Sequence, residues 1–112
     1  MKTRNPTITR NTAKIPKTVS NAAAAVIRDT LEEHGVTQVA AARAMKISPA
    51  LLSDIIRQRK GVSASVALRF EACFGTPADF LVRLQAQHDF RKAYHANGPA
   101  IRREVTVLTV SH

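Results

Sequence analysis

The side chains with the clearest chemical potential form a cluster of positive charge in the middle of the chain. Arg57, Arg59 and Lys60 lie close together with no acidic residue between them. Guanidinium and ammonium groups in such a cluster bind phosphate oxygens, and an arginine can also bind the paired acceptors of guanine. Arg57 is the best candidate for a guanine contact. The alternative is a solvated helix end whose charges have no partner.

The stretch that must position these charges, residues 37–60, predicts two short helices joined by a tight turn. Thr37 and Ser48 are good N-cap residues, and Pro49 suits a first helical turn, where its missing N–H needs no partner. Small or apolar residues recur where two crossing helices would touch, namely at Val39, Ala41, Ala42, Met45, Leu52 and Ile55. This is the layout of a helix-turn-helix DNA reader, whose second helix enters the major groove.

The turn between these helices requires a residue at positive φ, and this chain places Lys46 there. A residue other than glycine costs about 1 kcal/mol in that conformation. Lys46 also adds a positive charge beside the predicted DNA-facing surface.

The predicted recognition helix has few groups that can read bases. Pro49 and Ala50 offer apolar contact only, for example to a thymine methyl group, whereas Ser53 can donate or accept a hydrogen bond. Phosphate contacts are better supplied, so affinity should depend strongly on salt. The candidate DNA-binding residues are Gln38, Lys46, Ser48, Pro49, Ala50, Ser53, Arg57, Arg59 and Lys60.

The composition of the 112 residues supports one small domain with a polyanionic partner. Lys and Arg number 17 against 8 Asp and Glu, and the net charge is +9. Cys73, the only cysteine, excludes an intramolecular disulfide, so we expect a reducing, cytoplasmic location. The four histidines lack the spacing of a metal site. No motif groups an acid, a base and a nucleophile as a catalytic site would. No apolar run reaches the length that is needed to span a membrane. We therefore expect no metal, no cofactor, no enzymatic activity and no membrane contact.

The flanking regions predict an ordered domain between two extensions. Residues 1–19 hold five basic residues, no acid and two prolines, which predicts a disordered arm that either follows phosphates or is only a solvated tail. A helical domain should occupy residues 20–96. Its first helix begins at Ser20 or Asn21, ends at Gly35, and carries Asp29, Glu32 and Glu33 on its exposed side.

Two further helices are expected after the basic cluster. One begins at Ser63 or Ser65 and ends at Gly75, with Cys73 in its core-facing stripe. The longest helix should run from Ala78 to about Ala96, where Asn97-Gly98-Pro99 would break it, and His88 on it is read as a structural histidine.

Residues 97–112 form the C-terminal extension, which contains a candidate short β-strand. The segment from Arg103 to Val110, REVTVLTV, is rich in β-branched residues. Nothing else in the chain offers a partner strand, so the mate would be a second subunit or another protein; the alternative is a disordered tail.

Segments from Gln38 to about Ala93 resemble the HigA-type antitoxins of the XRE, or lambda-repressor-like, helix-turn-helix family. The resemblance rests on Thr37-Gln38, Ile47-Ser48, Arg59-Lys60-Gly61-Val62-Ser63, Val66-Ala67-Leu68-Arg69-Phe70, Phe74-Gly75-Thr76-Pro77-Ala78-Asp79-Phe80 and Leu84-Gln85-Ala86-Gln87-His88-Asp89. One departure is Arg57-Gln58, where the family usually has Asn-Gly.

The resemblance implies a five-helix, all-α domain that forms a homodimer and represses its own operon. As the antitoxin of a type II toxin-antitoxin system, it would bind double-stranded operator DNA with inverted repeats and neutralise a cognate RelE/HigB-like, mRNA-cleaving toxin. Two other interpretations stay open. One is a stand-alone or phage-type repressor without a toxin, and the other is a protein-binding module that has lost its DNA contact.

Overall fold

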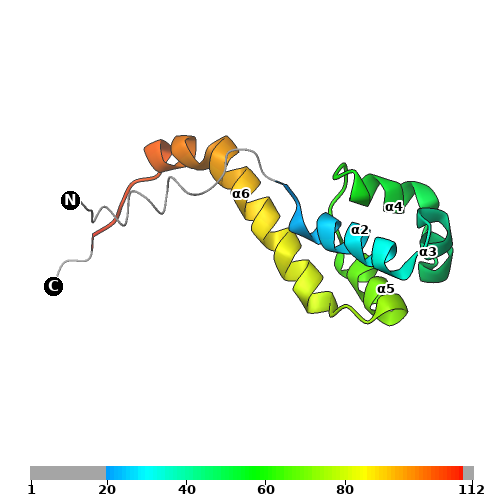
Figure 1. The fold of residues 1–112 in the computed structure, drawn as a ribbon. Coiled ribbons are helices and arrows are strands. Elements are labelled where there is room, and N and C mark those ends of the chain that lie inside the picture. The colour runs from blue at the N-terminus through cyan, green and yellow to red at the C-terminus, as the bar shows by residue number, and fades with distance from the viewer. Residues whose placement is uncertain (1–19, 110–112) are drawn as a thin grey trace, which may run out of the picture. The chain divides into compact units, whose positions relative to one another are not determined.

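Five α-helices follow one another in residues 20–109, the part of the chain that this computed structural model describes (Figure 1). They are α2 (Ala22–His34), α3 (Gln38–Met45), α4 (Pro49–Ile56), α5 (Ala64–Phe74) and α6 (Ala78–Glu104). The predicted all-α, five-helix fold is confirmed for these residues. The predicted basic arm, residues 1–19, lies outside them.

The first four helices begin where the sequence places hydrogen-bonding caps. Side-chain oxygens of Asn21, Thr37, Ser48 and Ser63 accept hydrogen bonds from backbone N–H groups in the first turns of α2, α3, α4 and α5. Each bond satisfies a donor that has no partner within its own helix. Asn21 rather than Ser20, and Ser63 rather than Ser65, therefore provide the caps.

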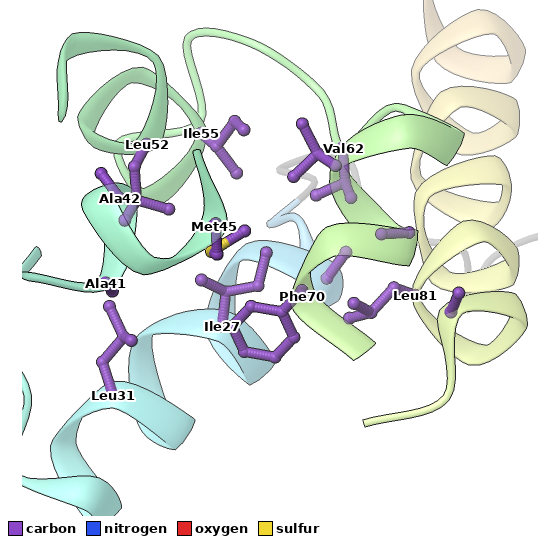
Figure 2. Close-up of a cluster of buried hydrophobic side chains, with 14 residues drawn as sticks. Ile27, Leu31, Ala41, Ala42, Met45, Leu52, Ile55, Val62, Phe70 and Leu81 are labelled. Atoms are coloured by element: carbon purple, nitrogen blue, oxygen red, sulfur yellow. The ribbon is translucent and has the colours of Figure 1, made fainter. Parts of the chain in front are cut away.

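Aliphatic side chains from all five helices form one buried core (Figure 2). In it α3 packs against both α4 and α5, while α2 packs against α4. Phe70 of α5 is the largest fully buried side chain, and it lies among Ile27, Leu81 and their neighbours. Apart from Phe70 and Met45, the buried side chains of this core are aliphatic.

Two apolar residues lie outside the core that the helical pattern assigned to them. Cys73 is an exposed free thiol, because the buried face of α5 is set by Val66, Ala67 and Phe70, and Cys73 falls at its margin. Val39 in the first turn of α3 keeps 45% of its surface exposed. Periodicity assigned both residues to the right helices but did not resolve the edge of the buried stripe.

The chain divides into two compact units, of which one is Ser20–His88 and the other includes residues 89–109. In the second unit α6 continues through Asn97, Gly98 and Pro99, so the predicted helix end near Ala96 was wrong. Proline removes one hydrogen bond but has a helical φ, and Gly98 has no Cβ to collide with its ring. Within this part of α6, the guanidinium carbon of Arg102 lies 5.4 Å from the centre of the Tyr94 ring.

The β-strand predicted for residues 103–110 is absent from the described residues. Arg103 and Glu104 complete α6, and residues 105–109 form neither strand nor helix. β-Branched composition favours a strand only when a partner supplies the ladder of hydrogen bonds, and residues 20–109 contain no other strand. Val107 and Leu108 are 83% and 89% exposed. No helix in residues 20–109 is long and apolar enough to span a membrane.

Candidate nucleic-acid interface

The pair of helices α3 and α4 has the close packing that the sequence predicts. Ala41 and Ala42 of α3, and Leu52 and Ile55 of α4, have no exposed surface. Because alanine has a small side chain, the two helices approach closely and the longer aliphatic groups of α4 fill the remaining space. The position of α4 is therefore fixed by packing.

Lys46 forms the turn between these helices in the left-handed conformation, with φ of 61°. Its backbone N–H donates to the carbonyls of Ala42 and Arg43, which ends α3. Arg69 of α5 adds a second support, since its guanidinium donates to the Met45 carbonyl at 3.0 Å. The predicted turn is confirmed, whereas the contribution of Arg69 follows only from the three-dimensional packing.

The first turn of α4 presents the predicted base-reading face to solvent. Pro49 and Ala50 are exposed, and Ser53 is half-buried. The Ser48 hydroxyl accepts a hydrogen bond from the Leu51 N–H at 3.0 Å, so its main task in this structure is to cap the helix. The exposed surface of this turn is small and largely apolar.

A segment that we call the basic loop, residues 57–61, follows α4 directly. Arg57, Arg59 and Lys60 are all exposed in it. Its backbone is folded back onto α4, because the N–H groups of Arg59 and Lys60 both donate to the Asp54 carbonyl, at 2.8 and 3.3 Å. The Lys60 ammonium also lies 3.9 Å from the Asp54 carboxylate. The loop thus holds three cations at the C-terminal end of α4.

Gln38 and Lys46 occupy the two ends of α3, at its first residue and its C-cap, and both are exposed. All nine predicted DNA-binding residues therefore belong to α3, α4 or the segments that immediately follow them. Seven of them, from Ser48 to Lys60, lie in α4, its cap or the basic loop.

Two polar residues at the basic loop, Gln58 and Gln85, were not predicted, and a third, Asn21, was predicted only as a helix cap. Gln58, inside the loop, has φ of 65°, and Asn21 and Gln85 are buried polar residues. A signal for Gln85 was present in the sequence, since it follows Leu81 and Leu84 at core-facing helical spacing, yet it is polar. The partner of such a residue lies far away in the chain, so its role was not visible in the local pattern.

Comparison with known proteins supports the same reading of the fold. A family model described as helix-turn-helix matches residues 27–81. The structure of the Pseudomonas aeruginosa antitoxin HigA with the higBA promoter is similar, with 36% identity and a TM-score of 0.73 over 78% of this chain and 96% of that one. The antitoxin GraA has 33% identity and a TM-score of 0.72, over 77% and 94% of the two chains.

A curated relative, the virulence-associated protein I of Dichelobacter nodosus, is 32% identical over 63 residues. The match covers 56% of this chain and 58% of that protein, so the chain spans little more than half the length of this relative. The structural matches, in contrast, extend over nearly the whole of HigA and GraA. The sequence identity and coverage of these structural matches, together with the helix-turn-helix core, show that this chain belongs to the HigA-type antitoxins of the XRE helix-turn-helix family.

Proposed function

We propose that this chain is a DNA-binding transcriptional repressor that acts as the antitoxin of a type II toxin-antitoxin pair. The observation that carries the proposal is the exposed first turn of α4 together with the exposed basic loop that directly follows the C-terminal end of α4. A helix held by its neighbours against the core, with a free outer face and adjacent cations, suits insertion into a major groove between two phosphate backbones. The solved structures of HigA with its promoter and of GraA with its operator support this use of the fold.

The residues have different roles in this proposal. Arg57, Arg59, Lys60, Lys46 and Gln38 contact phosphates, with Arg57 also within reach of a guanine. Pro49, Ala50 and Ser53 face the base edges, and Ser48 capping places them there. Because so few groups read bases directly, operator choice depends on the spacing of two half-sites and on DNA shape as well. The repressor therefore acts as a homodimer on an inverted repeat.

The DNA-binding part is tested by titrating a labelled duplex from the region upstream of this reading frame at several salt concentrations. The logarithm of the association constant should fall linearly with the logarithm of salt concentration, by about 0.9 per phosphate contact. The double variant Arg57→Ala, Arg59→Ala should bind more weakly and lose about 1 to 2 from the slope.

Arg83→Ala is the matched control, because Arg83 is an exposed arginine of α6 that is already paired with Asp79 at 3.0 Å. It should leave the slope unchanged. An unaltered slope in the double variant would remove both loop arginines from the phosphate contacts.

The antitoxin part is tested by co-expressing this chain with the neighbouring reading frame and purifying through a tag on this chain. A small RelE-like protein that co-purifies, and whose toxicity to growth is suppressed by this chain, is the expected result. A repressor that binds the upstream DNA with no such partner would instead be the stand-alone type.

A further inference from the structure

Two buried amide side chains, those of Asn21 and Gln85, lie next to the basic loop and bind each other, although they are 64 positions apart in the chain. Asn21 precedes α2 and is 1% exposed, and Gln85 of α6 is 9% exposed. The Asn21 amide nitrogen donates to Gln85 Oε1 at 2.8 Å. Asn21 Oδ1 meanwhile accepts from the Ala23 N–H at 2.9 Å as the α2 cap. Buried polar groups cost stability unless they are paired, so the pair constrains how these segments meet.

Hydrogen bonds of Asn21 and Gln85 reach the basic loop on both sides of Arg59 and Lys60. At the C-terminal end, Gln85 Oε1 also accepts from the Val62 N–H at 2.8 Å. At the N-terminal end, the backbone N–H of Asn21 donates to the side-chain Oε1 of Gln58 at 3.0 Å. The two exposed cations Arg59 and Lys60 lie between these attachment points.

The packing of Gly61 shows how closely Gln85 lies against the loop backbone. A Cβ atom added at Gly61 would lie 2.8 Å from Gln85 Nε2 and 2.9 Å from Gln85 Cδ. Real Cβ atoms do not approach other atoms so closely, so any residue larger than glycine would displace the Gln85 amide. Side-chain packing and hydrogen bonding therefore set the path of the loop together.

We propose that Gln85 is a positioning residue for the phosphate contacts of the basic loop. This inference rests on the proposed DNA-binding function. Gln85 is buried and uncharged, so it acts through two contacts on either side of Arg59 and Lys60. It binds the backbone N–H of Val62 directly, and it holds Asn21, whose backbone N–H binds the Gln58 side chain. Long cationic side chains and the loop that carries them lose conformational entropy when they bind DNA. A loop backbone that is already ordered in the free protein loses less entropy on binding, so the complex is more stable.

The test is a double-mutant cycle of Gln85→Met and Arg59→Ala, measured by DNA binding at several salt concentrations. Methionine matches glutamine in length and charge but accepts no strong hydrogen bond. Gln85→Met should weaken binding about tenfold, the equivalent of one charge-assisted contact, and reduce the salt slope by about 1. Arg59→Ala should then have a smaller effect in the Gln85→Met background than in the wild type, because both changes act on the same contact.

Gln87→Met is the control, since Gln87 is exposed on the same helix and should leave binding unchanged. Thermal melts establish that each variant is folded at the assay temperature. If Gln85→Met is not folded, Gly61→Ala replaces it with the same expected result, because it displaces the Gln85 amide while retaining every donor and acceptor.

The outcomes separate the two proposals. Wild-type protein that shows no salt-dependent binding to the upstream duplex would overturn the proposed function. If the wild-type protein binds, two results would overturn the positioning role alone. One is a folded Gln85→Met or Gly61→Ala variant whose salt slope is unchanged. The other is strict additivity of the two substitutions in the double-mutant cycle.

Discussion

A lysine occupies the one position of the helix-turn-helix that most favours glycine. Lys46 has φ of 61°, and Gln58 at the start of the basic loop has φ of 65°. These two are the residues other than glycine with positive φ in the described part of the chain, and they flank α4 on its two sides. Each conformation costs about 1 kcal/mol, so the stability of α4 must come from its caps and its buried face.

Two substitutions at Lys46 separate conformational strain from charge. Lys46→Gly should raise the free energy of unfolding by about 1 kcal/mol relative to Lys46→Ala, because only glycine adopts positive φ without strain. Both variants lose the same positive charge, so both should bind DNA slightly more weakly than the wild type and to the same extent. Urea denaturation and DNA titration of the two variants measure these quantities. Equal unfolding free energies would contradict a strained turn.

Residue-level prediction succeeded where the signal was local. Thr37, Ser48 and Lys46 were assigned from capping preferences and motif spacing, and the structure confirms all three roles. Gln58 and Gln85 were missed because their partners, Asn21 and Val62, are 37 and 23 positions away from them. A single sequence shows that such residues are polar, but it does not show which distant residues they bind.

At the level of elements, the sequence predicts the four shorter helices more accurately than the longest one. Each of α2 to α5 begins at a capping side chain, and three of them end at a left-handed residue, so their limits are set within a few residues of sequence. The end of α6 has no such determinant, since Gly98 and Pro99 lie inside it. The predicted strand failed for a related reason, because strand formation depends on a partner that local composition does not reveal.

Pro99 should weaken the last turns of α6 without preventing them. Pro99→Ala restores an N–H that can donate to the carbonyl of residue 95, and removal of an interior proline is worth up to about 3 kcal/mol of helix stability. We expect hydrogen exchange of the backbone amides of residues 100–104 to slow by up to about two orders of magnitude. Pro77→Ala, a change just before the first residue of α6, is the control and should leave these amides unaffected. Unchanged exchange in Pro99→Ala would show that the missing hydrogen bond does not limit their opening.

At the level of the whole molecule, net charge is concentrated at the N-terminus. Residues 1–19 hold five of the 17 basic residues and no acidic one. Asn21, just after this segment, is hydrogen-bonded to Gln58 of the basic loop. The chain therefore enters the domain next to the cations that we propose contact phosphates, which favours an arm that follows the same DNA backbone.

Removal of residues 1–18 should weaken DNA binding and reduce the salt slope, by at most about 4.5 if all five charges contact phosphates. A full-length variant with serine at Lys2, Arg4, Arg10, Lys14 and Lys17 retains the length of the arm and should show the same loss. Fluorescence anisotropy over a range of salt concentrations measures both proteins. A slope equal to that of the wild type would leave the arm as a solvated tail.

The hydrogen bond between Asn21 and Gln58 also has a consequence for the speed of binding. It places the first turn of α2 beside Arg59 and Lys60, whereas the last turn of the same helix carries the exposed acids Glu32 and Glu33. A helix of 13 residues is about 20 Å long, so the two charge groups are separated by most of that length. Positive and negative charge are thus separated along α2, and the field of a polyanion attracts one end of the helix and repels the other. We expect encounters with DNA to favour the basic end for this reason, which raises the association rate at low ionic strength.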